Sequence, residues 1–325
     1  MKFDVITIGS ASRDVFLASD NFKVIQDSQF STGQGLAVGL GSKIELSKIV
    51  LTTGGGGTNV AVTFARQEFK TSCISVVGLD ANGEVIISDL EKEGVDTQYF
   101  QKHDDDVSAY STILVDQSGE RSILSYKGEG QHFDGSKIPF DELECDWAYV
   151  NSLGGHFEIL EKIVAWAGQK NIKLAINPGS KELALGSDKL LPALKTFEIV
   201  SMNQEEAGEL LGIDYSNEEE IFKKADELIG GIFIMSKGHE GVSVSDGKNI
   251  YTAGVPDSPI VERTGAGDAF TSGFVSEYIR SGDIVKAIQF ATANASSVVT
   301  LFGAKAGILK KGDVGPWPLV EVSVK

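Results

Sequence analysis

One short segment of the sequence places glycines and a carboxylate at the start of a helix pattern. Gly265 and Gly267 stand in Glu262-Arg-Thr-Gly-Ala-Gly-Asp-Ala-Phe-Thr-Ser-Gly-Phe274 and let the backbone approach a ligand closely. The helix that follows presents unpaired N–H groups and the positive end of its macrodipole, which predict an anion site. Asp268 lies in the first turn, where a carboxylate repels a bound anion. It is useful there if it accepts a proton from a hydroxyl that attacks phosphorus; otherwise it is an ordinary helix-N-terminal carboxylate beside a tight turn.

Three further glycine-containing segments precede this one in the chain. They are Gly54-Gly-Gly-Gly-Thr-Asn-Val-Ala-Val62, Val77-Gly-Leu-Asp-Ala-Asn-Gly83 and Gly94-Val-Asp-Thr97. Together with Thr264-Gly-Ala-Gly-Asp-Ala-Phe270 they resemble the signatures of the pfkB, or ribokinase-like, family of carbohydrate and nucleoside kinases. The resemblance runs from Ile8 to about Gly307, nearly the whole chain. It implies an ATP-dependent phosphotransferase that phosphorylates a hydroxyl of a sugar, a sugar derivative or a nucleoside and uses Mg²⁺ to neutralise the β- and γ-phosphates.

The resemblance assigns the catalytic roles to the glycine-and-carboxylate segment. Asp268 matches the family's catalytic base. The backbone amides of Gly265, Ala266 and Gly267 match the anion hole for the transferring phosphoryl group. Both features suit a loose, negatively charged transition state.

The acceptor-binding residues implied by the resemblance lie near the N-terminus. Asp14, in Gly9-Ser-Ala-Ser-Arg-Asp14, resembles the carboxylate that accepts hydrogen bonds from sugar hydroxyls, although taken alone it could equally be a turn residue. Gly55 and Gly56 admit a sugar ring close to the backbone, and Asn59 offers a donor and an acceptor to neighbouring hydroxyls. The alternative is a glycine-rich turn that caps the following helix, and both interpretations can hold together.

The nucleotide-binding residues implied by the resemblance follow later strands. Asn203 and Glu206 match an Asn-x-x-Glu element that organises Mg²⁺ largely through water, with Glu206 as the metal-associated carboxylate; the alternative is a helix-capping pattern. The remaining positions border the nucleotide or its adenine in relatives and are Lys237, Gly238, Gly241, Thr264 and Asn294. For Asn294, a polar residue on a packed helix is the alternative.

The sequence departs from the family pattern at three positions. Glu262 stands where relatives carry an aspartate that belongs, in ribokinase, to a monovalent-cation site, so potassium activation is in doubt. Arg263 adds a cation beside the anion hole; it touches a phosphate of the nucleotide or substrate, or it pairs with a surface acid. Ala175 replaces an aspartate of a frequent Asp-Pro-Asn-Pro element, which weakens the analogy to any one subfamily.

Short apolar strands alternate with amphipathic helices and predict a mostly parallel sheet covered on both faces. Examples are the strand over Ser72–Gly78 and the helix over Phe157–Lys170. Two strand-and-turn regions, 22–51 and 108–126, predict a small β-sheet lid outside the main sheet. No linker separates independent domains, so we expect one three-layer ribokinase-like α/β/α domain over residues 1–325 with this lid, which forms a homodimer interface in many relatives.

Composition excludes several classes of protein. The 29 Lys and Arg against 46 Asp and Glu give a net charge of −17, which makes nucleic acid and anionic membranes unexpected partners. Two cysteines, no secretion signal and no long apolar span favour a protein of the reducing cytoplasm. The first strand is not followed by Gly-x-Gly-x-x-Gly, and no Walker motif occurs, which disfavours a dinucleotide-dependent oxidoreductase and a Walker-type NTPase. A non-catalytic sugar or nucleotide sensor on the same fold stays as an alternative, although a sensor has no need of Asp268.

Overall fold

The computed structural model describes residues 1–30, 33–117 and 120–325. Its centre is a nine-stranded sheet in the order β17-β16-β15-β14-β13-β12-β11-β1-β6. In that order the strands are Val322–Val324, Ile250–Ala253, Val242–Ser245, Ile232–Ser236, Ile199–Asn203, Lys173–Ile176, Glu144–Val150, Lys2–Ile8 and Thr71–Ile74. The neighbours from β6 to β14 are parallel, and β15, β16 and β17 extend the sheet antiparallel. The predicted mostly parallel sheet is therefore confirmed.

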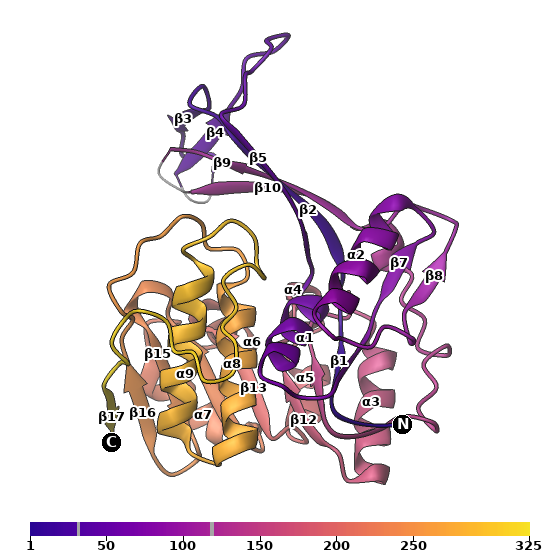
Figure 1. Ribbon diagram of the computed structural model, residues 1–325. Helices are drawn as coiled ribbons and strands as arrows, with labels where there is room; N and C mark the ends of the chain where they lie inside the picture. The colour runs from indigo at the N-terminus through magenta and orange to yellow at the C-terminus, as the bar shows by residue number, and fades with distance from the viewer. Residues whose placement is uncertain (31–32, 118–119) are drawn as a thin grey trace.

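Helices cover both faces of the large sheet because neighbouring strand residues point to opposite sides. On β1, Val5 packs in the hydrophobic core on one face of the sheet, and Ile6 packs in the core on the opposite face. Each core is covered by its own set of helices. The first set is α1 (Gly56–Arg66), α8 (Ala266–Ser281) and α9 (Ile284–Val298). The second set is α3 (Phe157–Lys170), α5 (Ser187–Leu194), α6 (Gln204–Leu211) and α7 (Glu218–Leu228). The resulting three layers, with α8 and α9 in orange and yellow, are visible in Figure 1.

A separate four-stranded sheet, called here the small sheet, projects beyond the large one (Figure 1). Its order is β10-β9-β2-β5, with bounds Arg121–Tyr126, Tyr110–Val115, Ser12–Ala18 and Lys48–Gly54. The hairpin expected within 108–126 forms β9 and β10, and residues 118–119 of that range lie outside the described residues. Region 22–51, apart from residues 31–32, which also lie outside them, supplies the hairpin of β3 (Lys23–Gln26) and β4 (Gln34–Ala37) and most of β5.

The small sheet contains a strand that the sequence ranges did not include. β2 pairs with both β5 and β9 and is an interior strand of the small sheet. β2 begins with the polar residues Ser12-Arg-Asp14, only a few residues after β1 ends. Polar residues directly after a strand are typical of a turn, so the sequence carries no sign of a second strand here. One face of the sheet packs through Phe16 and Ile113 against Phe302 from the C-terminal segment.

The edge of the large sheet beside β6 also differs from expectation. The single strand expected over Ser72–Gly78 is interrupted, because β6 ends at Ile74 and the following β7 (Val76–Gly78) pairs with β8 (Gln101–His103) in a two-stranded sheet. Helix α2 (Ala81–Lys92) begins at this point, capped by Asp80, whose carboxylate accepts a hydrogen bond from Gly83 N at 2.8 Å. The short helices are α4 (Ser180–Leu183), η1 (Gly128–Gln131) and η2 (Gly238–Glu240). Within the described ranges, no helix is both long and apolar enough to cross a bilayer.

Candidate active site

A cavity of about 410 Å³ lies between the small sheet and the loops that leave three parallel strands of the large sheet. The loops follow the carboxyl ends of β1, β11 and β12, where ligands of open α/β sheets bind. The cavity contains most of the acceptor-binding and catalytic residues implied by the resemblance. These are Asp14, Gly55, Gly56, Asn59, Gly265 and Asp268; Thr264, predicted to border the nucleotide, also lines this cavity.

Asp268 is held in this cavity by two side-chain amides. Its Oδ2 accepts a hydrogen bond from Asn59 Nδ2 at 2.8 Å, and its Oδ1 accepts one from Asn151 Nδ2 at 3.0 Å. Burial raises the pKa of the Asp268 carboxyl, while these two amides and the charge of Lys305 act in the opposite direction. The result is an oriented carboxylate whose proton affinity exceeds that of an ordinary aspartate, as proton transfer from a hydroxyl requires.

The backbone before Asp268 is shaped by glycine. Gly265 has φ of +81°, and a Cβ at this position would overlap Ala304. Gly267 differs, because a Cβ there would meet no atom within 4 Å. Protein packing therefore explains Gly265, whereas the open space at Gly267 is available to a ligand that approaches the helix N-terminus.

Two buried polar atoms of the cavity have no hydrogen-bond partner among the described residues. They are Asn59 Oδ1 and Thr264 Oγ1. A buried polar atom without a partner is costly, so its presence in a cavity indicates a group that a ligand satisfies. Asn59 thus has one end fixed on Asp268 and the other end free to accept a hydrogen bond.

Asp14 approaches the same cavity from the small sheet. It lies on β2, is 5% exposed, and its Oδ1 accepts a hydrogen bond from Ser12 Oγ at 2.8 Å. Burial raises the pKa of the Asp14 carboxyl, with Ser12 and Lys305 opposing the rise. A Cβ at Gly54 would overlap Asp14 Oδ2, and one at Gly56 would overlap Asn151 Oδ1. The glycine run therefore makes room for two polar side chains of the site.

Two residues of the site were absent from the sequence analysis. Asn151 directly follows β11, and its Oδ1 accepts a hydrogen bond from Ser152 N at 2.7 Å, so its amide nitrogen points to Asp268. The available signal was a polar residue immediately after the apolar run of a strand. Lys305 is 8% exposed and donates to Thr53 Oγ1 at 2.8 Å. Its only sequence signal was a lysine in a run of small residues.

Lys305 is the buried cation near the two site carboxylates. Burial lowers the pKa of Lys305 to about 8, while the negative charge of Asp14 favours the protonated form. The lysine charge in turn lowers the pKa of both Asp14 and Asp268 relative to burial alone. The protonated lysine therefore helps to keep both carboxylates ionised.

A second cavity, of about 140 Å³, lies on the other side of the α8 N-terminus. Four of the predicted residues line it: Gly238, Gly241, Ala266 and Gly267. Gly241 has φ of +97°, and a Cβ there would overlap the carbonyl oxygen of Ala253. The first turn of α8 thus separates the cavity with Asp14 and Asp268 from the cavity with the Gly238–Gly241 turn.

The other nucleotide-site residues are occupied by protein contacts. Lys237 Nζ forms an ion pair with Glu218 at 3.0 Å. Asn203 and Glu206 form a reciprocal capping box: Asn203 Oδ1 accepts from Glu206 N, and Glu206 Oε2 accepts from Asn203 N, both at 2.8 Å. Burial raises the pKa of the Glu206 carboxyl. The capping alternative is therefore realised at this element.

Asn294 lies in the packed interior and lines neither cavity. Its Nδ2 donates to the carbonyl oxygen of Ala269 and its Oδ1 accepts from Leu309 N, both at 2.8 Å. The side chain is fully buried and joins α8, α9 and the C-terminal segment. The structure places Asn294 in the packing role that was its alternative to an adenine contact.

The two departures before Gly265 have defined partners. Buried Glu262 accepts hydrogen bonds from Thr264 N at 2.6 Å and Gly303 N at 3.1 Å. Arg263 forms an ion pair with Glu120 of the small sheet's hairpin, with Nη1 and Oε1 2.9 Å apart. Of the two alternatives for Arg263, the structure shows the surface pair.

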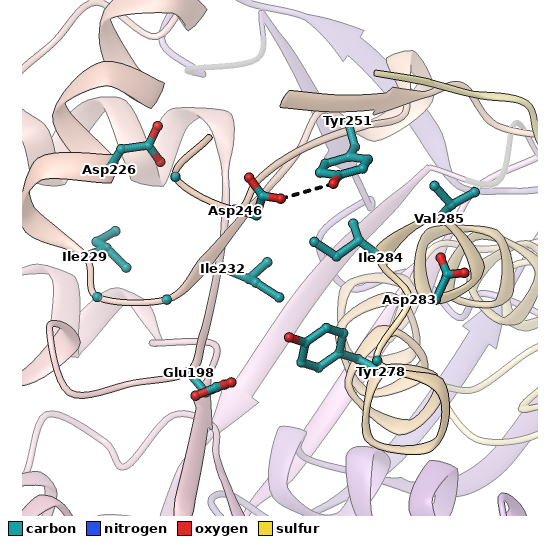
Figure 2. Close-up of a pocket in the computed structure, with 14 residues that line it drawn as sticks. Glu198, Asp226, Ile229, Ile232, Asp246, Tyr251, Tyr278, Asp283, Ile284 and Val285 are labelled. Atoms are coloured by element: carbon teal, nitrogen blue, oxygen red, sulfur yellow. Dashed lines mark hydrogen bonds between the residues drawn. The ribbon is translucent and has the colours of Figure 1, made fainter. Parts of the chain in front are cut away.

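A larger pocket, of about 630 Å³, lies at the opposite end of the large sheet (Figure 2). Its carboxylates are Glu198, Asp226, Asp246 and Asp283, and Asp246 accepts a hydrogen bond from Tyr251 at 3.0 Å. None of the residues lining it is a lysine or an arginine, so it repels phosphate groups. The pocket borders the amino-terminal ends of β13 and β14, whereas the candidate site lies beyond the carboxyl ends of the parallel strands. The two are therefore separate.

Comparison with known proteins addresses the family and the fold of the chain. The sequence matches the pfkB family carbohydrate kinase over residues 3–311. The ribokinase of Haemophilus influenzae is 30% identical over 78% of this chain and 83% of its own, and the ATP-dependent ribose-1-phosphate kinase of Halopiger xanaduensis is 27% identical over 78% and 82%. The structure of Arabidopsis thaliana ribokinase complexed with ribose and ATP superposes with a TM-score of 0.77 at 19% identity, covering 97% of this chain and 98% of the other.

These findings confirm the predicted fold and the predicted kinase class. The structural neighbours are ribokinases and related kinases, and the chain that superposes on them has a large, mostly parallel sheet with helices and a small separate sheet. The relatives are phosphotransferases with ribose, ribose 1-phosphate or nucleosides in their names. The chain belongs to the pfkB family of carbohydrate kinases.

Proposed function

We propose that Asp268 is the base in the transfer of a phosphoryl group from ATP to a hydroxyl of a sugar or nucleoside acceptor. The observation that carries this proposal is the position of the first turn of α8, with Asp268 facing one cavity and Gly267 facing the other. An acceptor in the first cavity and a triphosphate in the second would meet at this turn. In-line transfer of the phosphoryl group needs the acceptor hydroxyl and the triphosphate to meet in this way. The protein then contributes mainly by positioning the two reactants and stabilising charge.

The acceptor is held by the groups that the first cavity leaves available. Asp14 accepts hydrogen bonds from two acceptor hydroxyls, and Asn59 Oδ1 accepts another. The reacting hydroxyl gives its proton to Asp268, which Asn59 and Asn151 keep in orientation. The backbone amides of Gly265, Ala266 and Gly267, at the N-terminus of α8, would stabilise the charge on the transferring group.

The donor set at the end of β13 suits Mg²⁺ held through water. Asn203 is exposed and Glu206 partly buried, and one Glu206 oxygen is used by the capping box. Mg²⁺ commonly keeps several waters and needs only one or two carboxylates besides phosphate oxygens. The ion would neutralise charge on the β- and γ-phosphates, and Asn203 and Glu206 would hold its water shell. Gly238 and Gly241 would border the nucleotide, with Lys237 and Thr264 nearby.

The small sheet acts as a lid over the acceptor. Ser111, Ile123 and Ser125 of its strands line the first cavity, so an acceptor would be enclosed from this side. Exclusion of water limits hydrolysis of ATP in place of transfer.

The free, buried cysteines Cys73 and Cys145 fit a reducing, cytoplasmic environment.

A homodimer through the small sheet is part of the proposal. Its outer face carries Ile49, Leu51 and Leu124, with exposed fractions of 58%, 58% and 60%. Exposed apolar side chains that share one face of a sheet are typical of an interface between subunits. The opposite face is occupied by Phe16, Ile113 and Phe302.

Replacement of the base tests the function directly. Asp268→Asn keeps the size of the side chain but removes the proton acceptor, so kcat should fall by roughly 10²-fold or more while ATP binding stays measurable. The measurement is ADP release with Mg-ATP against a panel of sugars, sugar phosphates and nucleosides, with ATP binding followed by calorimetry. Turnover close to that of the wild type would remove Asp268 from the role of base. If the wild-type protein binds ATP but releases no ADP with any acceptor of the panel, the result would favour the alternative of a non-catalytic sensor.

A further inference from the structure

Two lysines line the acceptor cavity and have no part in the proposed transfer. Lys127 follows β10, and Lys181 lies in α4. Neither lines the cavity on the nucleotide side of α8. Within the described residues, neither forms an ion pair with a carboxylate. Both ammonium groups are thus available to a molecule in the acceptor cavity.

A buried glutamate fixes the backbone close to each lysine. Glu129, two residues after Lys127, is 0% exposed; its carboxylate accepts a hydrogen bond from Asp106 N and contacts His132 Nδ1 at 2.9 Å. Glu182, next to Lys181, is 2% exposed; it accepts hydrogen bonds from the backbone of Leu153, Gly155 and Gly179. These hydrogen bonds fix the backbone near the two exposed lysines, and neither glutamate lines the cavity to compete for them.

The charge of the cavity is unusual for this protein. The whole chain carries −17, yet the two lysines equal in number the two carboxylates that line the cavity, Asp14 and Asp268. Those carboxylates already have acceptor hydroxyls as partners. A neutral sugar offers the two ammonium groups no anionic partner, whereas a phosphate monoester supplies several strong acceptor oxygens.

We propose that the natural acceptor is an anionic sugar, a sugar phosphate monoester in particular, whose charged group binds between Lys127 and Lys181. This inference rests on the proposed function, since it names the acceptor class of the same site. It assigns the two lysines to acceptor specificity and leaves phosphoryl transfer to Asp268. A nucleoside, whose base carries no negative charge, would gain nothing from them.

Binding separates this inference from the catalytic proposal. We would titrate the Asp268→Asn protein with ribose 1-phosphate, ribose 5-phosphate, fructose 1-phosphate and fructose 6-phosphate, with the parent sugars, and with ribonic and gluconic acids. At least one phosphate ester should bind about tenfold or more tightly than its parent sugar. Lys127→Met and Lys181→Met should each weaken that ester about tenfold and leave the parent sugar unchanged. Lys223, an exposed lysine of α7 outside the cavity, provides the matched charge control, and Lys223→Met should change neither affinity.

Kinetics on the wild-type background complete the test. Each cavity-lysine variant should raise KM for the phosphate ester with little change in kcat. Sugar acids that bind as tightly as the esters, with the same lysine dependence, would place the acceptor among carboxylated sugars and support the anionic site. Equal affinity for ester and parent sugar, or ester binding indifferent to both substitutions, would overturn the inference even if neutral sugars are phosphorylated. Lysine-dependent binding without turnover of any acceptor would overturn the proposed function and leave the inference standing.

Discussion

At the scale of single residues, the site depends on carboxylates and a lysine whose protonation is altered by burial. Asp268 and Asp14 are enclosed and have raised pKa values, and Lys305 is the buried cation that offsets them. The sequence identified both aspartates because family motifs surround them. Asn151 and Lys305 could not be recognised, because their importance comes from contacts between segments more than 100 residues apart in the chain.

The pH profile of kcat/KM should report these groups. Asp268 must be ionised to accept a proton, and because burial raises its pKa, activity should fall on acidification at a higher pH than an ordinary aspartate would give. Activity should also fall as pH rises through about 8, where Lys305 loses its charge. Lys305→Met should remove this alkaline limb and lower kcat/KM about tenfold. An unchanged alkaline limb in the variant would assign it to another group.

The same lysine makes a defined contribution to stability. Its pKa is about 8 in the folded protein and near 10.5 in the unfolded chain, so the unfolded chain binds more protons between these values. Taken by itself, Lys305 therefore makes the folded state more stable as pH rises across that window. The loss of activity above pH 8 is thus expected without unfolding, which circular dichroism at each pH can verify.

At the scale of elements, the start of α8 separates glycines needed for folding from glycines needed for function. Gly265→Ala would place a side chain at positive φ and against Ala304, so unfolding free energy should fall by roughly 2 kcal/mol or more. Gly267→Ala meets open space and adds helix propensity, so stability should be unchanged or rise slightly, while transfer is impaired because the new methyl group lies where the phosphoryl group approaches. Urea denaturation and initial rates measure the two effects separately. If Gly267→Ala has wild-type kcat, the phosphoryl group does not pass over this turn.

Regular elements were predictable where hydrophobic periodicity is strong. The expected helix over Phe157–Lys170 has the same bounds in the structure, because its apolar stripe is continuous. β2 and the interruption between β6 and β7 were not predictable. Each depends on which distant strand supplies hydrogen-bond partners, and local sequence carries no information on that choice.

At the scale of the whole molecule, the exposed outer face of the small sheet predicts self-association. Leu124→Asp would introduce a charge on the outer face that also carries Ile49 and Leu51 and should shift a dimer to monomer in light scattering at micromolar concentration. Leu301→Asp alters a similarly exposed leucine outside that sheet and is the matched control. A Leu124→Asp protein with the molar mass of the wild type would exclude this face from any interface.

The small sheet also carries a residue of the active site. Asp14 belongs to β2, whereas Asp268 belongs to α8 on the large sheet, so the distance between the two carboxylates changes whenever one sheet moves relative to the other. An acceptor large enough to touch both fixes that distance, and a water molecule cannot. If Asp268 is the base, as proposed, ATP bound alone would face a base without a correctly placed nucleophile, and we expect ATP to be consumed only when an acceptor spans the two sheets.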